Sequence, residues 1–72
     1  MSENKFLEGK VILITGAGSG FGRELAITFA NKGADLALND INMESLEETK
    51  KLVLHENDVT ILLVKTLSSM VA

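Results

Sequence analysis

The chain has 72 residues, 46% of them hydrophobic and 24% charged, which is enough for one small globular domain or a part of a larger one. Its formal net charge is −3, so we expect no nucleic-acid partner, because such partners require a basic surface. The sequence contains no cysteine and one histidine, which excludes disulfides and thiolate metal sites, and we expect no metal.

Residues 1–9 form a polar lead-in that ends at Gly9, and they contain no apolar stretch of signal-peptide length. The longest uninterrupted apolar runs, at 11–14 and 61–64, are too short to span a bilayer. We therefore expect a cytoplasmic protein with no membrane contact.

The first strand is predicted at 10–15, where an apolar, β-branched run precedes a glycine-rich loop. A helix should follow from about residue 20 to 32, with Gly33 as its stop. Apolar residues at helical spacing indicate its buried stripe. They are Phe21, Leu25, Ala26, Phe29 and Ala30. Arg23 is expected on the solvated surface of this helix, with a phosphate contact as the alternative.

A second strand is predicted at 34–39, with Asp40 at its carboxyl end. Asn42 is a good N-cap residue for a helix that runs to about residue 56 and places Met43, Leu46 and Val53 on one face. A third strand follows at 59–64, and residues 67–72 resemble the start of another helix.

The order β-α-β-α-β predicts an α/β fold with a parallel three-stranded sheet and right-handed crossovers. Both helices should then cover one face of the sheet. The other face should be bare and carry parts of the strands at 11–14 and 61–64. Such an apolar face is typical of an interface or an aggregation site.

The loop at 15–22 holds four of the six glycines of the chain. A strand, a glycine turn and a helix direct several backbone N–H groups and the positive end of the helix at one place, which suits a phosphate. A Walker A loop is excluded, because Phe21 follows Gly20 and Arg23 follows Gly22 where lysine and a hydroxyl residue are required. The spacing G-x-G-x-x-G fails at Phe21. The spacing that fits is G-x-x-x-G-x-G.

With Thr15 in front, this loop resembles the T-G-x-x-x-G-x-G cofactor motif of the short-chain dehydrogenase/reductase family. The resemblance extends over residues 7–72 and implies the N-terminal, incomplete part of a Rossmann-type sheet and a nicotinamide dinucleotide as partner. It also implies the cofactor-binding residues. They are Gly16, Gly18, Ser19, Gly20, Phe21, Gly22, Asp40 and Thr66. The main chain from Ser19 to Phe21 would hold the pyrophosphate, and Gly16 would allow the tight turn.

Asp40 lies 18 residues after Gly22, where an acid can accept hydrogen bonds from both hydroxyls of the adenosine ribose. It would repel a 2′-phosphate, and its neighbours Ser19, Asn39 and Ile41 supply no compensating cation. We therefore predict NAD, with NADP less favoured.

Thr66 takes the place at which the family carries an aspartate close to the adenine. A hydroxyl accepts hydrogen bonds more weakly than a carboxylate. Lys65 beside it adds a positive charge that the family pattern does not require.

The resemblance implies hydride transfer between a nicotinamide and an alcohol or carbonyl substrate, performed in the family by a Tyr-x-x-x-Lys pair with a serine and an asparagine. This chain contains no tyrosine, so we assign no catalytic residue. We expect a 72-residue segment truncated after the third strand, inactive alone and part of a larger oxidoreductase. Homo-oligomers are common in the family, and the resemblance allows one for a full-length form.

Two other functions remain open at this point. The glycines at 16, 18 and 20 also fit the G-x-G-x-G loop of an S-adenosylmethionine-dependent methyltransferase, although Ile14 and Thr15 stand where such proteins carry an acid. The chain could also be a noncatalytic interaction module that docks a partner on its bare sheet face.

Overall fold

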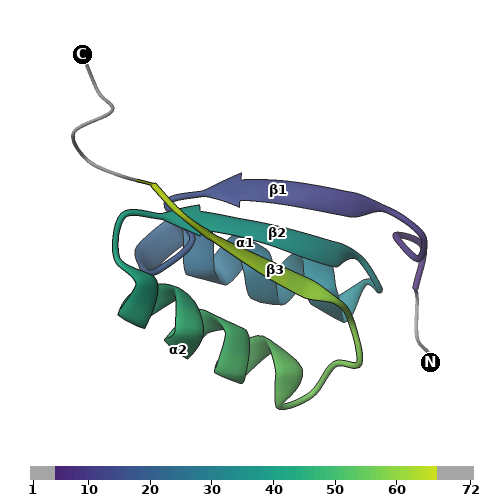
Figure 1. Cartoon of the computed structure of the whole chain (residues 1–72). Helices are drawn as coiled ribbons and strands as arrows, with labels where there is room; N and C mark the ends of the chain where they lie inside the picture. Colours follow the sequence, from purple (N-terminus) through teal and green to yellow (C-terminus); the bar gives the residue numbers. More distant parts are fainter. Residues whose placement is uncertain (1–4, 67–72) are drawn as a thin grey trace.

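The computed structural model describes residues 5–66 and contains five elements (Figure 1). In chain order they are β1 (Val11–Thr15), α1 (Gly20–Asn31), β2 (Asp35–Asp40), α2 (Met43–Leu54) and β3 (Ile61–Lys65). The predicted β-α-β-α-β order is confirmed, with boundaries that differ from the predicted ones by one or two residues. The helix expected at 67–72 lies outside the described residues.

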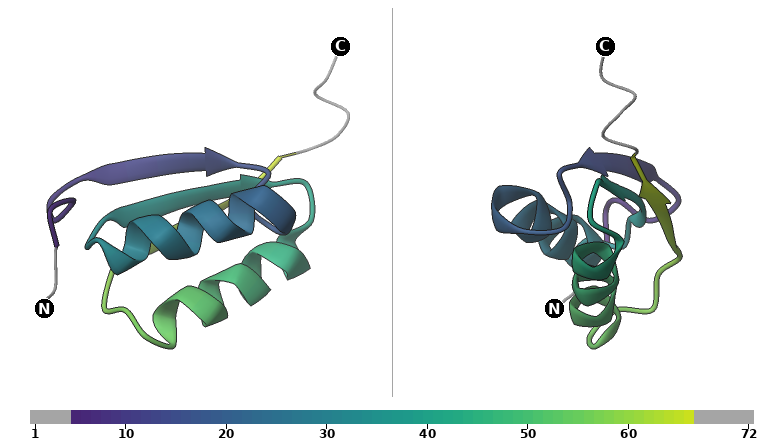
Figure 2. Two further views of the ribbon diagram at one scale, coloured as in Figure 1. Left: turned by 180° about the vertical axis from the view of Figure 1, so that it is seen from behind. Right: turned by 60° about the vertical axis from the view of Figure 1, so that its left-hand side comes forward.

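The three strands form one parallel sheet in the order β1-β2-β3. Helix α1 packs on β1 and β2, and α2 packs on β2 and β3. Figures 1 and 2 show both helices on the same side of the sheet, as right-handed crossovers require. The predicted fold class, an α/β segment of a Rossmann-type sheet, is confirmed.

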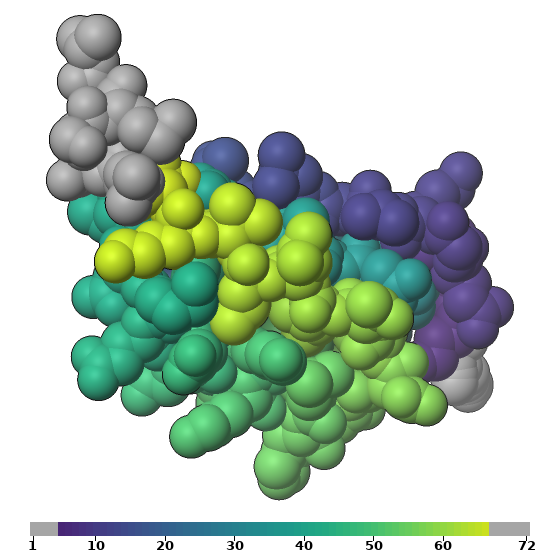
Figure 3. Space-filling view, in the orientation of Figure 1, coloured from purple at the N-terminus to yellow at the C-terminus, as the bar shows by residue number. Residues whose placement is uncertain are grey.

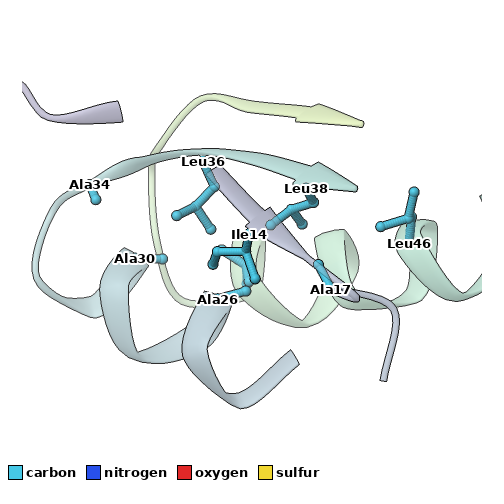
Figure 4. Close-up of a cluster of buried hydrophobic side chains, with 9 residues drawn as sticks. Ile14, Ala17, Ala26, Ala30, Ala34, Leu36, Leu38 and Leu46 are labelled. Atoms are coloured by element: carbon cyan, nitrogen blue, oxygen red, sulfur yellow. The ribbon is translucent and has the colours of Figure 1, made fainter. Parts of the chain in front are cut away.

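The core lies between the sheet and the two helices (Figure 4). Alternate residues of β2, Leu36 and Leu38, point from the sheet toward the helices, as the two-residue period of a strand dictates. On α1 the facing residues are Ala26 and Ala30, whose small side chains allow the helix to approach the strands closely. Leu46 completes this layer from α2, which confirms the helix face predicted from its spacing.

Within residues 5–66, no helix or strand covers the opposite face of the sheet (Figure 1). Val11 and Leu13 of β1 are 72% and 66% exposed, and Leu62 of β3 is 61% exposed. Figure 3 shows β3 at the surface of the molecule above α2. The predicted one-sided sheet is therefore confirmed.

The expected stripe of α1 is wrong at its first position. Phe21 is 79% exposed, whereas the residues of α1 that are buried are Gly22, Ala26 and Ala30. The helix is rotated so that Gly22 faces the glycine loop, and this rotation directs the neighbouring Phe21 side chain outward.

Residues 5–9 of the lead-in are more structured than a polar tail. The amide of Leu7 donates to the carbonyl of Lys32 at 2.9 Å, and the Leu7 side chain packs against the core. This segment closes over the end of α1, where Gly33 has a φ of 95°. Gly33 thus ends the helix as predicted, because the left-handed region suits glycine.

Candidate functional site

The predicted site residues gather at one edge of the sheet, where the strands end at their carboxyl termini. The loop after β1 is tied to β2 by a hydrogen bond of 2.9 Å from the Ala17 amide to the Asn39 carbonyl. Beyond β3, the amide of Thr66 donates to the carbonyl of Asp40, also at 2.9 Å. In parallel α/β sheets this edge is where ligands bind.

Two kinds of glycine build the loop. Gly16 and Gly20 have φ angles of 64° and 55°, which residues with a side chain rarely adopt. Gly22 serves a different purpose, since a Cβ atom there would lie 2.1 Å from the carbonyl oxygen of Gly16. The start of α1 therefore rests directly on the backbone of the turn.

The N-terminus of α1 opens toward this edge. Its N-cap residue, Ser19, is extended and makes no side-chain capping bond, and the first turn contains no acid. The first intrahelical hydrogen bond runs from the Arg23 amide to the Ser19 carbonyl at 3.3 Å. The amides of Gly20, Phe21 and Gly22 precede that bond, so no turn of helix lies before them to accept their hydrogens. This end of the helix suits an anion.

Asp40 lies beside the loop and is held by main-chain amides. Its Oδ2 accepts from the Gly18 amide at 2.8 Å, and its Oδ1 accepts from the Asn42 amide at 3.2 Å. The Gly18 bond is the main cause that lowers the pKa of Asp40 below the ordinary aspartate value, so the carboxylate is charged at neutral pH. Each oxygen keeps a further lone pair with which it can accept a hydrogen bond from a hydroxyl.

Gly18 is buried against this carboxylate. A Cβ atom on it would lie 2.8 Å from Asp40 Oδ2 and 2.7 Å from Ser45 Cβ. Its amide is therefore engaged with Asp40, which distinguishes Gly18 from the more exposed positions Ser19 and Gly20 that follow it.

Thr66 is partly exposed at the end of β3. The side-chain amide of Asn39 donates to the Val64 carbonyl at 3.2 Å and also to the Thr66 hydroxyl oxygen. Lys65 is the register partner of Asp40 in the neighbouring strand. The fold thus places a lysine opposite Asp40 in the neighbouring strand, a pairing that the chain neighbours of Ser19 and Asp40 did not reveal.

The expectation that Arg23 lies on the solvated surface is wrong. Its side chain is only 24% exposed and turns toward α2. There Nε donates to the Thr49 hydroxyl at 2.9 Å, and Nη2 donates hydrogen bonds to three oxygen atoms. They are the carbonyls of Gly18 and Ser45 and the carboxylate of Glu48.

Thr49 is a second residue that the sequence reasoning missed. It is fully buried, and its hydroxyl donates to the Ala17 carbonyl at 2.8 Å while it accepts from Arg23. The helical spacing indicates that Thr49 is buried, because it lies three residues after Leu46 and four before Val53 on the buried face of α2. Arg23 likewise precedes Ala26 and Ala30 by three and seven residues.

Among residues 5–66, no group of histidine, cysteine or carboxylate side chains could hold a metal ion. Within the same range, none of the helices has the length and apolar character needed to cross a membrane.

The family follows from the sequence match. The model of the short chain dehydrogenase family matches residues 10–70, which include the loop and Asp40. The chain belongs to the short-chain dehydrogenase family. The glycine spacing is thereby assigned to the family that its motif resembled.

Proteins similar to this chain come from distant organisms. An uncharacterized oxidoreductase of Thermotoga maritima is 54% identical over 46 residues, which cover 64% of this chain and 18% of the relative. The 7alpha-hydroxysteroid dehydrogenase of Escherichia coli K12 is 52% identical over 44 residues, or 61% and 17% of the two chains. Epidermal retinol dehydrogenase 2 of Homo sapiens is 56% identical over 48 residues, or 67% and 16%.

Among solved structures, levodione reductase superposes with a TM-score of 0.81 at 41% identity, over 83% of this chain and 24% of that one. A hydroxysteroid dehydrogenase from Escherichia coli gives a TM-score of 0.78 at 36% identity, over 89% and 26%. The chain therefore spans less than a fifth of the curated relatives described above and about a quarter of these structures.

Proposed function

We propose that this chain binds NAD as the dinucleotide-binding segment of an oxidoreductase. The observation that carries the proposal is the placement of a charged carboxylate, Asp40, next to the open N-terminus of α1. The helix end supplies N–H groups for a pyrophosphate, and Asp40 can accept from the two ribose hydroxyls. Membership of the short-chain dehydrogenase family supports a nicotinamide cofactor.

In this proposal the cofactor lies along the carboxyl edge of the sheet. Gly16 and Gly20 shape the turn, and the amides of Ser19 to Phe21 contact the pyrophosphate. Gly22 lets the start of α1 lie against the glycine loop, and the Gly18 amide donates a hydrogen bond to Asp40. Thr66 provides a hydroxyl near the adenine.

We propose NAD over NADP because a 2′-phosphate would meet the charged Asp40. The two basic side chains in this part of the fold, Arg23 and Lys65, only partly offset this repulsion. Arg23 already pairs with the Glu48 carboxylate at 3.2 Å, and Lys65 is exposed, where solvent screens its charge.

The chain as given contains no tyrosine, so we propose cofactor binding without catalysis for these 72 residues. Hydride transfer between the nicotinamide and an alcohol or carbonyl substrate is proposed for the whole oxidoreductase. The family match accounts for the glycine spacing that a methyltransferase loop also fitted, and no observation favours that alternative or an interaction module.

Thermal unfolding of the chain with and without NAD tests the proposal. A ligand that binds only the folded state stabilises it by about 2.7 kcal/mol at a hundredfold excess over Kd. We expect NAD to raise the Tm and NADP at the same concentration to raise it less. The matched variant Asp40→Asn, which has nearly the same shape but no charge, should narrow the difference between the two cofactors.

Each result addresses a separate part of the proposal. A transition that neither dinucleotide moves contradicts cofactor binding by this chain. A larger shift with NADP than with NAD contradicts the assigned role of Asp40 but leaves dinucleotide binding in place.

A further inference from the structure

Arg23 and Thr49 hold the inner side of the glycine loop, which faces α2. The Thr49 hydroxyl donates to the Ala17 carbonyl at 2.8 Å, and Arg23 Nη2 donates to the Gly18 carbonyl. Two consecutive loop carbonyls are therefore bound from the same side. The guanidinium is in turn bonded to Thr49 and paired with Glu48, so its own position is defined by α2.

Because the peptide bond is planar, a contact that fixes the direction of a carbonyl also fixes the direction of the N–H in the same peptide. In a trans peptide the C=O and N–H bonds point in opposite directions. The Ala17 carbonyl points at Thr49, and the N–H of the same peptide, on Gly18, points at Asp40. This first peptide is therefore held at both ends.

Among residues 5–66, the next peptide is held by a hydrogen bond at one end only. Its carbonyl, on Gly18, accepts from Arg23, so its N–H, on Ser19, must point away from the guanidinium. Ser19 is exposed, is extended and precedes the first turn of α1. Its amide is thus directed away from α2, and it comes directly before the amides of the first turn of α1.

We propose that Arg23 is a positioning residue that orients the Ser19 amide, and with it the loop, for a pyrophosphate without touching the ligand. This inference deepens the proposed function and rests on it for the identity of the ligand. Arginine suits the task because its planar fork offers donors in a fixed geometry, whereas the single ammonium of a lysine cannot bond Gly18 and Thr49 in the same way.

The test compares two ligands that share the adenosine but differ in the pyrophosphate. The Kd values of NAD and of adenosine are measured by NMR titration of the wild-type chain, Arg23→Lys and Arg23→Gln. We expect the Kd of NAD to rise about tenfold in both variants, which corresponds to about 1.4 kcal/mol. The Kd of adenosine should stay within about twofold, since the Asp40 carboxylate remains in place.

A matched control removes a charge elsewhere. Lys51 is an exposed cation of α2, so Lys51→Gln changes the net charge as Arg23→Gln does. We expect it to leave the ratio of the two Kd values unchanged. Equal weakening of NAD and adenosine in the Arg23 variants, or an equal effect in Lys51→Gln, would overturn the positioning role.

Amide hydrogen exchange without ligand separates this inference from the proposed function. The Gly18 amide donates to Asp40 within the loop, and the Leu36 amide donates to the Thr60 carbonyl within the sheet. In Arg23→Lys we expect the Gly18 amide to lose about tenfold more protection than the Leu36 amide. A proportional loss at both amides would mean that Arg23 only stabilises the whole fold, and it would overturn the inference.

The exchange result stands even where the cofactor result fails. A wild-type chain that binds neither NAD nor adenosine contradicts the proposed function and the pyrophosphate contact. A selective loss at Gly18 then still supports Arg23 as the residue that orders the loop.

Discussion

At the scale of single residues, Asp40 connects the parts of the site. Its carboxylate accepts one hydrogen bond from the Gly18 amide in the loop and another from the Asn42 amide in the turn before α2. These bonds favour the charged form and lower the pKa of Asp40. The same contacts that would prepare Asp40 for a ribose therefore also stabilise the folded chain.

This linkage predicts a pH dependence. Because the pKa of Asp40 is lower in the folded chain than in the unfolded chain, the unfolded chain takes up the proton first as the pH falls. The contribution of Asp40 is thus fully present above the unfolded-state pKa of about 3.9 and is lost as the pH falls through the lower folded-state value. We expect Asp40→Asn to lower the free energy of unfolding at pH 7 and to approach the wild type at acidic pH.

Urea unfolding of both chains between pH 2 and pH 7 measures this difference. Asp58→Asn is the matched control, because Asp58 is exposed. A difference between Asp40→Asn and the wild type that stays constant with pH would contradict the linkage.

At the scale of elements, the junction between the loop and α1 depends on one close contact. Gly22 brings the first turn of α1 against the Gly16 carbonyl, and this contact sets the rotation of the helix. That rotation leaves Phe21 exposed and turns Arg23 toward α2. The absence of a side chain at Gly22 therefore determines where the side chains of Phe21 and Arg23 lie.

Two alanine substitutions separate steric exclusion from backbone strain. Gly22→Ala would place a Cβ atom 2.1 Å from a backbone oxygen, and we expect a loss of about 3 kcal/mol, at the upper end of the usual cost of overpacking. Gly20→Ala meets no atom within 4 Å but adopts a φ of 55°, which costs about 1 kcal/mol. Urea unfolding measures both free energies, and equal losses would contradict the proposed contact.

At the scale of the whole molecule, the sheet has two unlike faces. The face under the helices carries the core, and the other face leaves Leu13 66% exposed although it neighbours the buried Ile14 in the same strand. Parallel sheets are ordinarily covered on both faces. The core that residues 5–66 form is therefore built from one side of the sheet alone.

This asymmetry predicts different costs for two leucines. Leu38 is fully buried, and we expect Leu38→Ala to lower the free energy of unfolding by about 3 kcal/mol. Leu13→Ala removes the same atoms from an exposed position and should cost under about 0.5 kcal/mol. Similar losses in urea unfolding of the two variants would show that the outer face is covered in solution.

The fold was predictable because its signals are local. Apolar runs, glycine stops and the Asn42 cap, whose side chain accepts from the Ser45 amide at 3.0 Å, each lie within a few residues of the element that they define. The loop spacing and Asp40 likewise lie at fixed distances along the chain. The predicted order of strands and helices and the family follow from these short-range patterns.

The sequence by itself thus determined the element order, the family and the loop that a dinucleotide would approach. Only the tertiary structure decided that Phe21 is exposed, that Arg23 turns inward and that Thr49 binds the loop. The physical reason is that these outcomes depend on the rotation of α1 against a backbone carbonyl and on its distance from α2. Both are set by contacts between residues far apart in the sequence, which no local pattern records.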